Sequence, residues 1–337
     1  MRIGRGNLRM IGLAVTLACL VLAAYAVDWR DTVRALGQID PKALVLAFAF
    51  LFATLLVFAL RWRQLIAHEP RPTPTRAFNL LMIGYLANAI LPARPGDIAR
   101  ALLLRQICRI SFSIGMASIM LERLLDVLAI CALGLAASFL VRLPALVATG
   151  LYSLAAAGLV LFSLMTLLSW RRDLISWTMR RYPYLFRHRL MRFLAEWLER
   201  FAGAMALFNA PGRLVASIVL TGLGWTALTG MLVVLVDAFH LPAPPVAALL
   251  VLVATSLGAT LPSSPGALGV YHFMAVLALS VWHVETSVAL AFAIVAHGLA
   301  IGVHIIFGLF GVWFEGIGIF GLTQIAQSDL AVAAQEP

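Results

Sequence analysis

Charged residues are scarce in this sequence. They make up 12% of the 337 residues, whereas 62% are hydrophobic, and the mean hydropathy is +0.97. A soluble domain carries about 25% charged residues, and a water-soluble fold of this size could not bury so much apolar surface. The composition therefore excludes a soluble globular protein, a disordered chain and a coiled coil, and it predicts a protein whose main solvent is lipid.

Cysteine is also rare. The three cysteines, Cys19, Cys108 and Cys131, lie far apart within apolar segments, which argues against a disulfide framework or a cysteine metal site. The sequence lacks a Walker loop, a Gly-x-Ser-x-Gly elbow and a His-Glu-x-x-His motif, so it gives no support to an ATPase, a serine hydrolase or a zinc protease. His297 and His304 share a helix face, but no third ligand has suitable spacing, and we expect no metal and no other cofactor.

Acidic residues are fewer than basic ones, 15 against 25, and only Lys42 among the basic residues is a lysine. A net charge of +10 could indicate nucleic-acid binding. The arginines, however, gather between apolar runs, as in the cytoplasmic loops of membrane proteins. Segment 171–212 mixes them with aromatic residues, which predicts amphipathic cytoplasmic helices on an anionic leaflet. We therefore expect membrane lipids as partners and no nucleic acid.

Apolar stretches long enough to cross about 30 Å of hydrocarbon predict an all-α polytopic membrane protein with about six crossings. They are Met10–Val27, Ala43–Leu60, Phe112–Phe139, Leu143–Trp170, Leu214–Val236 and Thr286–Phe314. The first follows basic residues but ends without a small-residue cleavage site, so we interpret it as a retained helix rather than a signal peptide. Residues 1–320 would then form a single membrane domain, followed by a flexible tail over 321–337.

Two further apolar segments are broken near their middle by one pattern, Leu-Pro-x-x-Pro-Gly. It occurs at Leu91–Gly96 and again, 170 residues later, at Leu261–Gly266. Each break follows one apolar stretch and opens another, which predicts two re-entrant helical hairpins and an internal repeat. The two halves, about 43–140 and 213–315, would have inverted topology.

The distribution of arginine predicts an orientation. With the N-terminus inside and both breaks as hairpin tips, 19 of the 25 basic residues fall on the cytoplasmic side and four fall outside, as the positive-inside rule requires. If the hairpins were full crossings instead, segment 171–212 would still lie on the cytoplasmic side. The charge distribution alone therefore does not exclude a topology with eight or more spans. We expect a multi-pass protein of the bacterial inner membrane with a cytoplasmic N-terminus.

The first hairpin tip holds the strongest chemical signature. Pro95 and Asp97 mark the start of a helix inside the bilayer, where free backbone N–H groups and the helix dipole attract anions. Arg94 and Arg100 add guanidinium groups suited to phosphate or carboxylate, and Asn88 precedes the break. We interpret this tip as a lipid-headgroup site. The alternative is a capped helix in a cytoplasmic loop.

The second tip offers hydroxyl groups instead of charges. Ser264 is a natural N-cap before the proline that follows it, and Ser263 lies beside it. Both serines are candidates for headgroup binding, with a tight contact between small residues as the alternative. His272 follows and is a candidate for charge balance or coupling. Gly298 and Gly302, on the last long helix, predict a face for close helix packing.

Three charged residues, Glu122, Arg123 and Asp126, interrupt the stretch Phe112–Phe139. Glu122 lies about 15 Å along the helix, near the bilayer centre, where an ionised group costs at least about 2.5–3.5 kcal/mol. The trio therefore pairs internally, with the arginines of the first tip as further partners, or faces a polar cavity. A structural ion network and a direct role in ligand contact or proton exchange are both consistent with this pattern.

Together these motifs resemble the lysylphosphatidylglycerol synthase transmembrane-region family, whose members are also described as flippase-like and include hopanoid-associated membrane proteins. The resemblance covers about 10–320 and rests on Asn88…Leu91-Pro92-x-Arg94-x-Gly96-Asp97…Arg100, on Glu122-Arg123-x-x-Asp126 and on Leu261-Pro262…Pro265-Gly266-x-Leu268-Gly269. His272 departs from it, because many relatives carry an acidic residue there. The resemblance implies movement of anionic or modified lipids between leaflets. Aminoacyl transfer is not expected, since only about 20 residues follow the last predicted span.

Three functions fit these observations. The first is a flippase-like transporter that moves an anionic phospholipid or a polyprenyl or hopanoid lipid between leaflets of the inner membrane. The second is a scaffold or accessory subunit that presents lipid to a glycosyl-, hopanoid- or lipid-modifying enzyme without transporting it. The third is an intramembrane transferase with Glu122 or Asp126 as base. No donor-binding motif supports the third, so we expect no enzymatic activity. The sequence does not set the oligomeric state.

Overall fold

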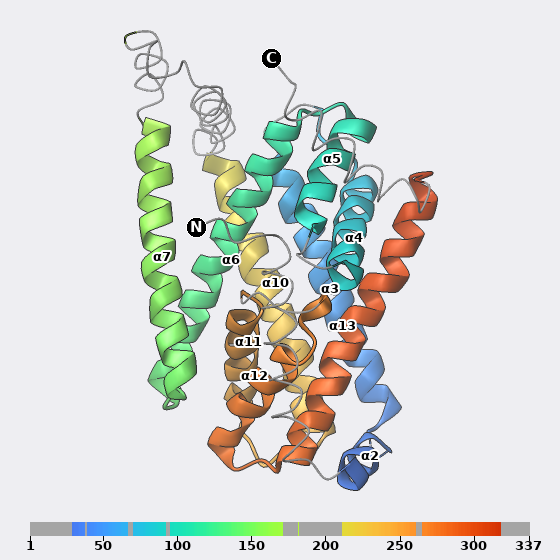
Figure 1. Ribbon diagram of the computed structural model, residues 1–337, viewed down its shortest axis with the longest axis vertical. Coiled ribbons are helices and arrows are strands. Elements are labelled where there is room, and N and C mark those ends of the chain that lie inside the picture. Colours follow the sequence, from blue (N-terminus) through green and yellow to red (C-terminus); the bar gives the residue numbers. More distant parts are fainter. Residues whose placement is uncertain are drawn as a thin grey trace, which may run out of the picture.

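The structure is a computed structural model that describes residues 29–37, 39–66, 70–91, 95–170, 181, 211–260 and 265–317. These residues form helices and connecting turns and contain no strand (Figure 1), which confirms the predicted all-α fold. Several predictions concern residues outside these ranges: the span Met10–Val27, nearly all of segment 171–212, the tail 321–337, and the site candidates Arg94, Ser263 and Ser264.

Five of the described helices contain 25 to 29 residues and extend along most of the molecule (Figure 1). They are α3 (Pro41–Leu65), α6 (Phe112–Leu140), α7 (Ala145–Trp170), α10 (Pro211–Ala238) and α13 (Thr286–Phe314). At about 1.5 Å per residue, each is long enough to cross a bilayer. Length and hydropathy also make the interrupted segment Pro265–Trp282 a candidate span. The chain is therefore a multi-pass membrane protein.

Local chemistry sets where several helices begin. Asp40 before α3, Thr73 before α4 (Pro74–Ile90) and Ser111 before α6 each accept a backbone N–H two or three residues further on. In α3 and α4 a proline follows the capping residue. A polar N-cap followed by proline is a helix start that can be read from sequence alone.

Two pairs of shorter helices form the predicted hairpins. α4 and α5 (Gly96–Cys108) share the upper end of the molecule in Figure 1, and α11 (Val246–Gly258) and α12 (Val270–Leu279) share the lower end. Each pair turns back near mid-height, so the hairpins enter from opposite ends. The remaining described elements are α2 (Trp29–Gly37) and the short 3-10 turns η3 (Pro265–Ala267) and η4 (Ser280–Trp282).

The packing partners repeat along with the hairpins. In the first half, α4 packs against α13 and α5 packs against α6. In the second half, the counterpart of α4 is α11, which packs against α6, and the counterpart of α5 is α12, which packs against α13. α3 and α10 pack against each other along their length. Thr54 of α3 donates a hydrogen bond of 3.4 Å to the carbonyl oxygen of Gly224 of α10, 170 positions further on, which is also the separation of the two tips. The two halves are therefore related as an inverted repeat.

The second tip lies against the first hairpin. η3 packs on α4, and a Cβ atom at Gly266 would lie 3.6 Å from the carbonyl oxygen of Ala89. The chain reverses through left-handed backbone at Gly266 (φ 66°), Ala267 (φ 56°) and Gly269 (φ 81°), a conformation that glycine adopts without strain. The two hairpins thus meet within the bundle.

Glycine also brings α13 close to α4, but not at the predicted positions. A Cβ atom at Gly308 or Gly311 would lie 2.9 or 3.0 Å from a backbone carbonyl of α4. Among the described residues, nothing lies within 4 Å of a Cβ atom at Gly298 or Gly302, so the close packing expected there stays a prediction. The residue types are suitable at all four positions, and the rotation of α13 decides which of them meet a neighbour.

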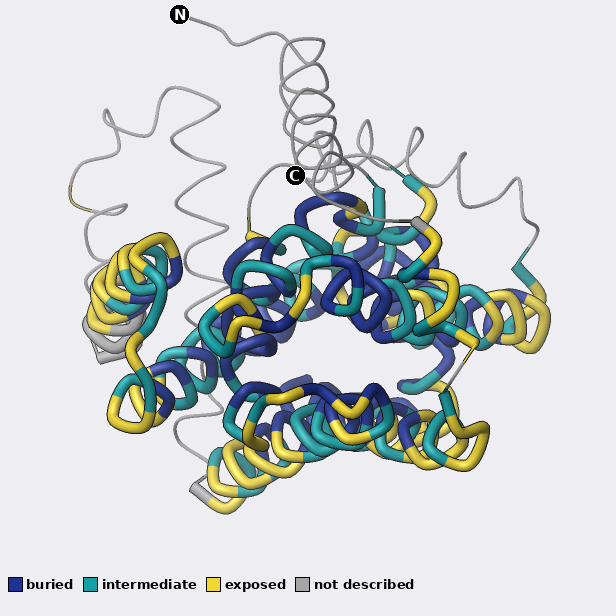
Figure 2. The backbone as a smooth tube through the Cα atoms, turned by 90° about the horizontal axis from the view of Figure 1, so that it is seen from below, coloured by how far each residue is buried: buried dark blue, intermediate teal, exposed yellow. Residues whose placement is uncertain are grey.

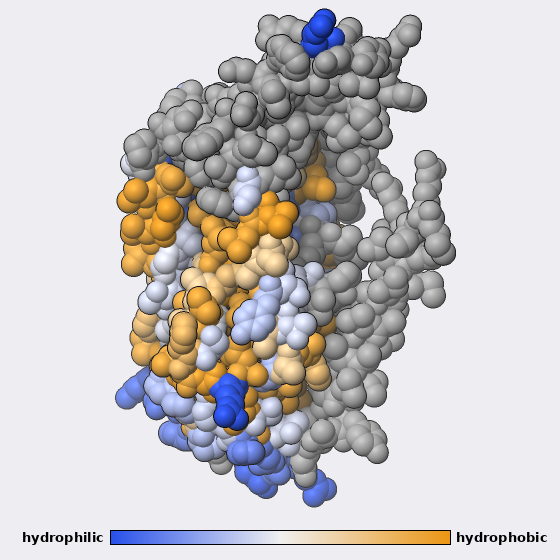
Figure 3. Space-filling view, turned by 90° about the vertical axis from the view of Figure 1, so that its left-hand side faces the viewer, coloured by the Kyte–Doolittle hydropathy of each residue, from blue (hydrophilic) through white to orange (hydrophobic). Residues whose placement is uncertain are grey.

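The outer surface is that of a lipid-facing protein. Buried residues lie on the inner sides of the helices, and exposed residues lie around the rim (Figure 2). On the face shown in Figure 3, hydrophobic residues cover much of the described mid-height, and hydrophilic residues gather toward the lower end, with one more at the top. Large apolar side chains such as Phe139 and Leu159 are exposed (81% and 61%), which water would penalise and hydrocarbon does not.

The turn between α4 and α5 supports a first prediction. The Gly96 N–H donates to Asn88 Oδ1 at 2.8 Å, and a Cβ atom at Gly96 would collide with the Gly84 carbonyl oxygen. Gly96→Ala is expected to push α4 and α5 apart at a cost of about 1–3 kcal/mol, seen as a lower melting temperature in detergent. Gly302→Ala is the control, because its methyl group has room. Equal melting temperatures for both variants would contradict the tight turn.

Candidate functional site

Buried charges from three helices meet at one place. Arg61 of α3, Arg100 of α5 and Glu122 of α6 are each at most 1% exposed. Arg100 Nη2 lies 2.8 Å from Glu122 Oε2, and Arg61 Nη2 lies 3.6 Å from Glu122 Oε1. One carboxylate therefore lies between two guanidinium groups, as expected where an unpaired buried charge would be very costly.

Asp126 extends this arrangement by one turn of α6 and ties it to α10. Its Oδ1 accepts hydrogen bonds from Arg61 Nη1 at 2.6 Å and from Trp225 Nε1 at 3.2 Å. Arg61 Nη1 also lies 3.4 Å from the hydroxyl of Thr221. Arg61 thus connects two carboxylates of α6 to Thr221 of α10, and Asp126 itself bonds to Trp225 of the same helix.

One edge of the cluster is open. The side chains of Arg123 and Asp97 are 46% and 34% exposed, and they form a two-pronged pair with Nη2–Oδ1 at 3.0 Å and Nε–Oδ2 at 3.3 Å. Arg123 Nη1 also lies 3.5 Å from Asp126 Oδ2. We name the whole cluster the ion network; its formal charges cancel, and its members are Arg61, Asp97, Arg100, Glu122, Arg123 and Asp126.

Aromatic rings support the two buried arginines. The Arg100 guanidinium lies 4.5 Å from the ring centroid of Trp62, and that of Arg61 lies 4.4 Å from Phe58. The Trp62 ring is itself held by a hydrogen bond of 3.0 Å from its Nε1 to the Ser118 hydroxyl. Cation–π contacts are strongest where the cation is desolvated. The arginines are therefore held in place from both sides.

The structure brings together the predicted residues of α5 and α6. Asp97, Arg100, Glu122, Arg123 and Asp126 lie in one cluster, and Glu122 pairs with Arg100 as expected. Whether they bind a headgroup or exchange a proton stays a prediction. Asn88 lies at the turn, where its oxygen accepts the Gly96 N–H.

Sequence analysis missed Arg61, Thr221 and Trp225. Arg61 is one of the 19 basic residues that the sequence places on the cytoplasmic side, because it stands close to the end of α3. The signal for Arg61 is faint: it is the first charged residue after the apolar run Ala43–Leu60. The partners on α10 had no comparable signal.

His272 lies away from the ion network, at the start of α12. The ring of Tyr271 stacks on the ring of His297 with centroids 4.3 Å apart, and His272 meets His297 edge-on at 5.1 Å. The Gly269 N–H lies 3.4 Å from His272 Nδ1. We name Tyr271, His272 and His297 the second-tip cluster. Within the described ranges, no three or more His, Cys, Asp or Glu residues are grouped to bind a metal.

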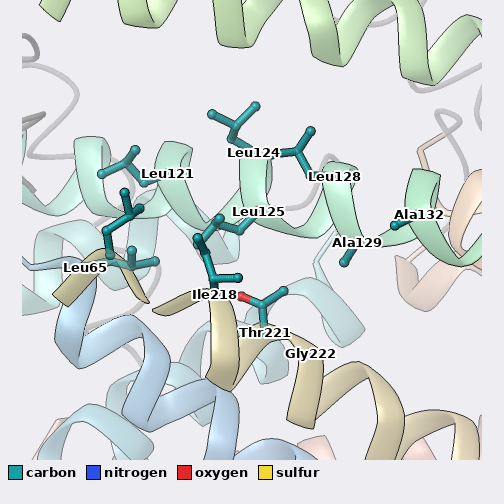
Figure 4. A pocket seen from close by; sticks show the side chains of 11 residues that line it. Leu65, Leu121, Leu124, Leu125, Leu128, Ala129, Ala132, Ile218, Thr221 and Gly222 are labelled. Atoms are coloured by element: carbon teal, nitrogen blue, oxygen red, sulfur yellow. The ribbon is translucent and has the colours of Figure 1, made fainter. Parts of the chain in front are cut away.

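An apolar groove of about 440 Å³ lies between α6 and α10 (Figure 4). Its lining residues are Leu65, Leu121, Leu124, Leu125, Leu128, Ala129, Ala132, Leu214, Ile218, Thr221 and Gly222. At 100° per residue on α6, the groove leucines and Arg123 point to opposite sides of the helix. Thr221 lines the groove and also contacts Arg61, so the groove adjoins the buried side of the ion network, and its composition suits a hydrocarbon chain.

Comparison with known sequences gives the protein a family. Residues 9–308 match the lysylphosphatidylglycerol synthase TM region. The chain belongs to this family. The matched residues of this chain include both hairpins and the complete ion network.

Two relatives of this protein are informative. The chain is 27% identical over 354 residues to the glycosyltransferase AglD of Haloferax volcanii, an alignment that covers 91% of this chain and 54% of AglD. It is 32% identical over 126 residues to a UPF0104 membrane protein of Methanothermobacter thermautotrophicus, covering 36% of each. The chain therefore spans about half the length of AglD, and the second alignment covers about a third of each of its two proteins.

Proposed function

We propose that this protein is a flippase-like transporter that moves an anionic lipid between the leaflets of the inner membrane, with its N-terminus in the cytoplasm. The observation that carries the proposal is the ion network, six ionisable side chains within a bundle of membrane-spanning helices. Apolar packing would hold the same helices together at lower cost, and charges inside a membrane mark substrate or ion pathways. Membership of a lipid-synthase transmembrane family supports a lipid as the substrate.

The open edge of the network is where a headgroup would bind. Arg123 and Asp97 are accessible there, beside the N-terminus of the 13-residue helix α5. An incoming phosphate would take the place of Asp97 as the partner of Arg123, one two-pronged contact replacing another. Arg100, which lies 3.9 Å from Asp97, would hold the displaced carboxylate. The hydrocarbon chains would stay in lipid.

Liposomes test the proposal. With fluorescent phosphatidylglycerol in both leaflets and a quencher outside, the wild type is expected to expose the inner-leaflet lipid faster than protein-free vesicles do. Arg123→Gln should slow this exchange at least about tenfold, the worth of one lost charged contact. Arg34→Gln, at the exposed pair Arg34–Asp31 on α2, should match the wild type. Exchange at the protein-free rate with phosphatidylglycerol, polyprenyl phosphate and hopanoid lipids would refute transport.

A scaffold role is the second candidate, favoured by one observation, the similarity to a protein named a glycosyltransferase that is about twice as long. In that role the chain would present lipid to a lipid-modifying enzyme. Co-purification of such an enzyme in stoichiometric amount, with lipid glycosylation unchanged in Arg123→Gln, would favour the scaffold. An intramembrane transferase finds less support, because both oxygens of Glu122 contact arginines and neither is free to serve as a base.

A further inference from the structure

The second-tip cluster occupies the position in the second half of the chain that corresponds to the position of the ion network in the first half. The network is built on α5 and α6 and the second-tip cluster on α12 and α13, and these helices are counterparts in the inverted repeat. The tip of the second hairpin, at Gly266, lies against the end of α4. An inverted repeat presents equivalent positions toward opposite faces of the membrane. A lipid headgroup that crosses by way of one of these positions would meet the other.

The second-tip cluster has the donors to bind an anion. His272 and Tyr271 are half-buried, and His297 is 7% exposed. Because the Gly269 N–H donates to His272 Nδ1, the proton of the neutral ring is on Nε2, which is left as a donor. The Tyr271 hydroxyl is a further donor, and its ring holds the His297 ring by stacking. The cluster thus combines two imidazoles with a phenol and carries no permanent charge.

No described carboxylate faces the second-tip cluster. The titratable groups around His297 are Tyr271 and His272 from α12 and His304 from its own helix. Tyr85 of α4 packs on the His304 ring at 4.7 Å. A protonated imidazole in this setting lacks an acidic neighbour, and a buried cation is stable only with an anionic partner.

We propose that the second-tip cluster is a second binding site for the phosphate of the lipid headgroup, filled when an imidazole is protonated. The inference rests on the proposed function. One phosphate diester, with a single negative charge, neutralises one imidazolium, so the headgroup arrives with a proton and leaves when the proton leaves. The ion network differs, because its arginines stay charged at every physiological pH. The two sites would therefore hold the same headgroup with different pH dependence.

Binding of a water-soluble lipid tests this directly. The full chain in detergent is titrated calorimetrically with dihexanoyl phosphatidylglycerol at about pH 4.5 and pH 8, so that protonation of a buried imidazole beside a bound phosphate falls between the two conditions. The wild type should bind about two equivalents at the lower pH and about one at the higher. His272→Gln combined with His297→Gln should bind one equivalent at both. Arg123→Gln should keep the pH-dependent equivalent and lose the other.

Two exposed histidines provide the control. His240 and His283 lie in turns outside the second-tip cluster and have left-handed backbone, so each is changed to Asn, which tolerates that conformation. This double variant should behave like the wild type. A wild type that binds the same number of lipids at both pH values, or a His272/His297 variant that keeps the pH-dependent equivalent, would overturn the second site. Two equivalents bound without lipid movement in liposomes would instead refute transport and leave the second site standing.

Discussion

Glu122→Gln is expected to be the most damaging single substitution in the described bundle. It removes the carboxylate that lies between Arg100 and Arg61, and both arginines stay buried, at most 1% exposed. Breaking a buried ion pair by removing one partner costs about 3–5 kcal/mol, because the other charge stays buried and unpaired. We expect a large drop in melting temperature in detergent and loss of the monodisperse peak in gel filtration.

A double variant separates charge from packing. Arg100→Gln combined with Glu122→Gln removes one charge of each sign and restores neutrality, so it should recover more than half of the lost stability. The unpaired buried charge, rather than the missing side-chain contacts of Glu122, would then be the cause of the damage. If Glu122→Gln melts with the wild type, or if the double variant is less stable than Glu122→Gln, the carboxylate does not hold the network together.

Arg61→Met should have the second-largest effect. Arg61 contacts both Asp126 and Glu122 and also reaches α10 through Thr221, so its loss leaves both carboxylates with one partner fewer and removes one of the polar links to α10. The expected cost is about 3–5 kcal/mol in the free energy of unfolding, followed by thermal melting in detergent. Arg61→Lys should recover part of it, because an ammonium group keeps the charge but not the planar fork.

The exposed pair on α2 is the control for Arg61. Arg34 and Asp31 are 2.6 Å apart, but their side chains are 69% and 37% exposed, and solvent-exposed pairs contribute about 0–1 kcal/mol. Arg34→Gln should therefore melt close to the wild type. A similar loss for Arg34→Gln and Arg61→Met would show that burial does not decide the strength of these pairs.

Much of the fold could be predicted because its signals are local. Uncharged runs give the long helices, and the two Leu-Pro-x-x-Pro-Gly breaks give the hairpins, since proline and glycine interrupt a helix wherever it lies. The distribution of arginine favours a cytoplasmic N-terminus, and the predicted crossings between the two hairpins then give their opposite entry. None of these inferences needs to know which helix touches which.

Membership of the ion network could be predicted only in part, because it depends on helix rotation. The spacing of Glu122, Arg123 and Asp126 puts them on neighbouring faces of one helix. Arg100 stands in the helix just before it, so the two consecutive helices can pair these charges. Arg61 belongs to a helix that packs on them only through tertiary contacts, and at the end of an apolar run it resembles an anchor at the membrane surface. The same reason explains why Gly308 and Gly311, rather than Gly298 and Gly302, meet α4.

Helix α7 has a consequence for how the second half is oriented. The first half begins at the lower end with α3 and finishes there with α6, so a directly connected second half would begin at the lower end too. α7 returns the chain to the upper end, and α10 then starts opposite to α3 (Figure 1). Among the described helices, the crossing made by α7 thus sets the parity of the two halves, and adding or removing one crossing between α6 and α10 would turn the antiparallel halves into parallel ones.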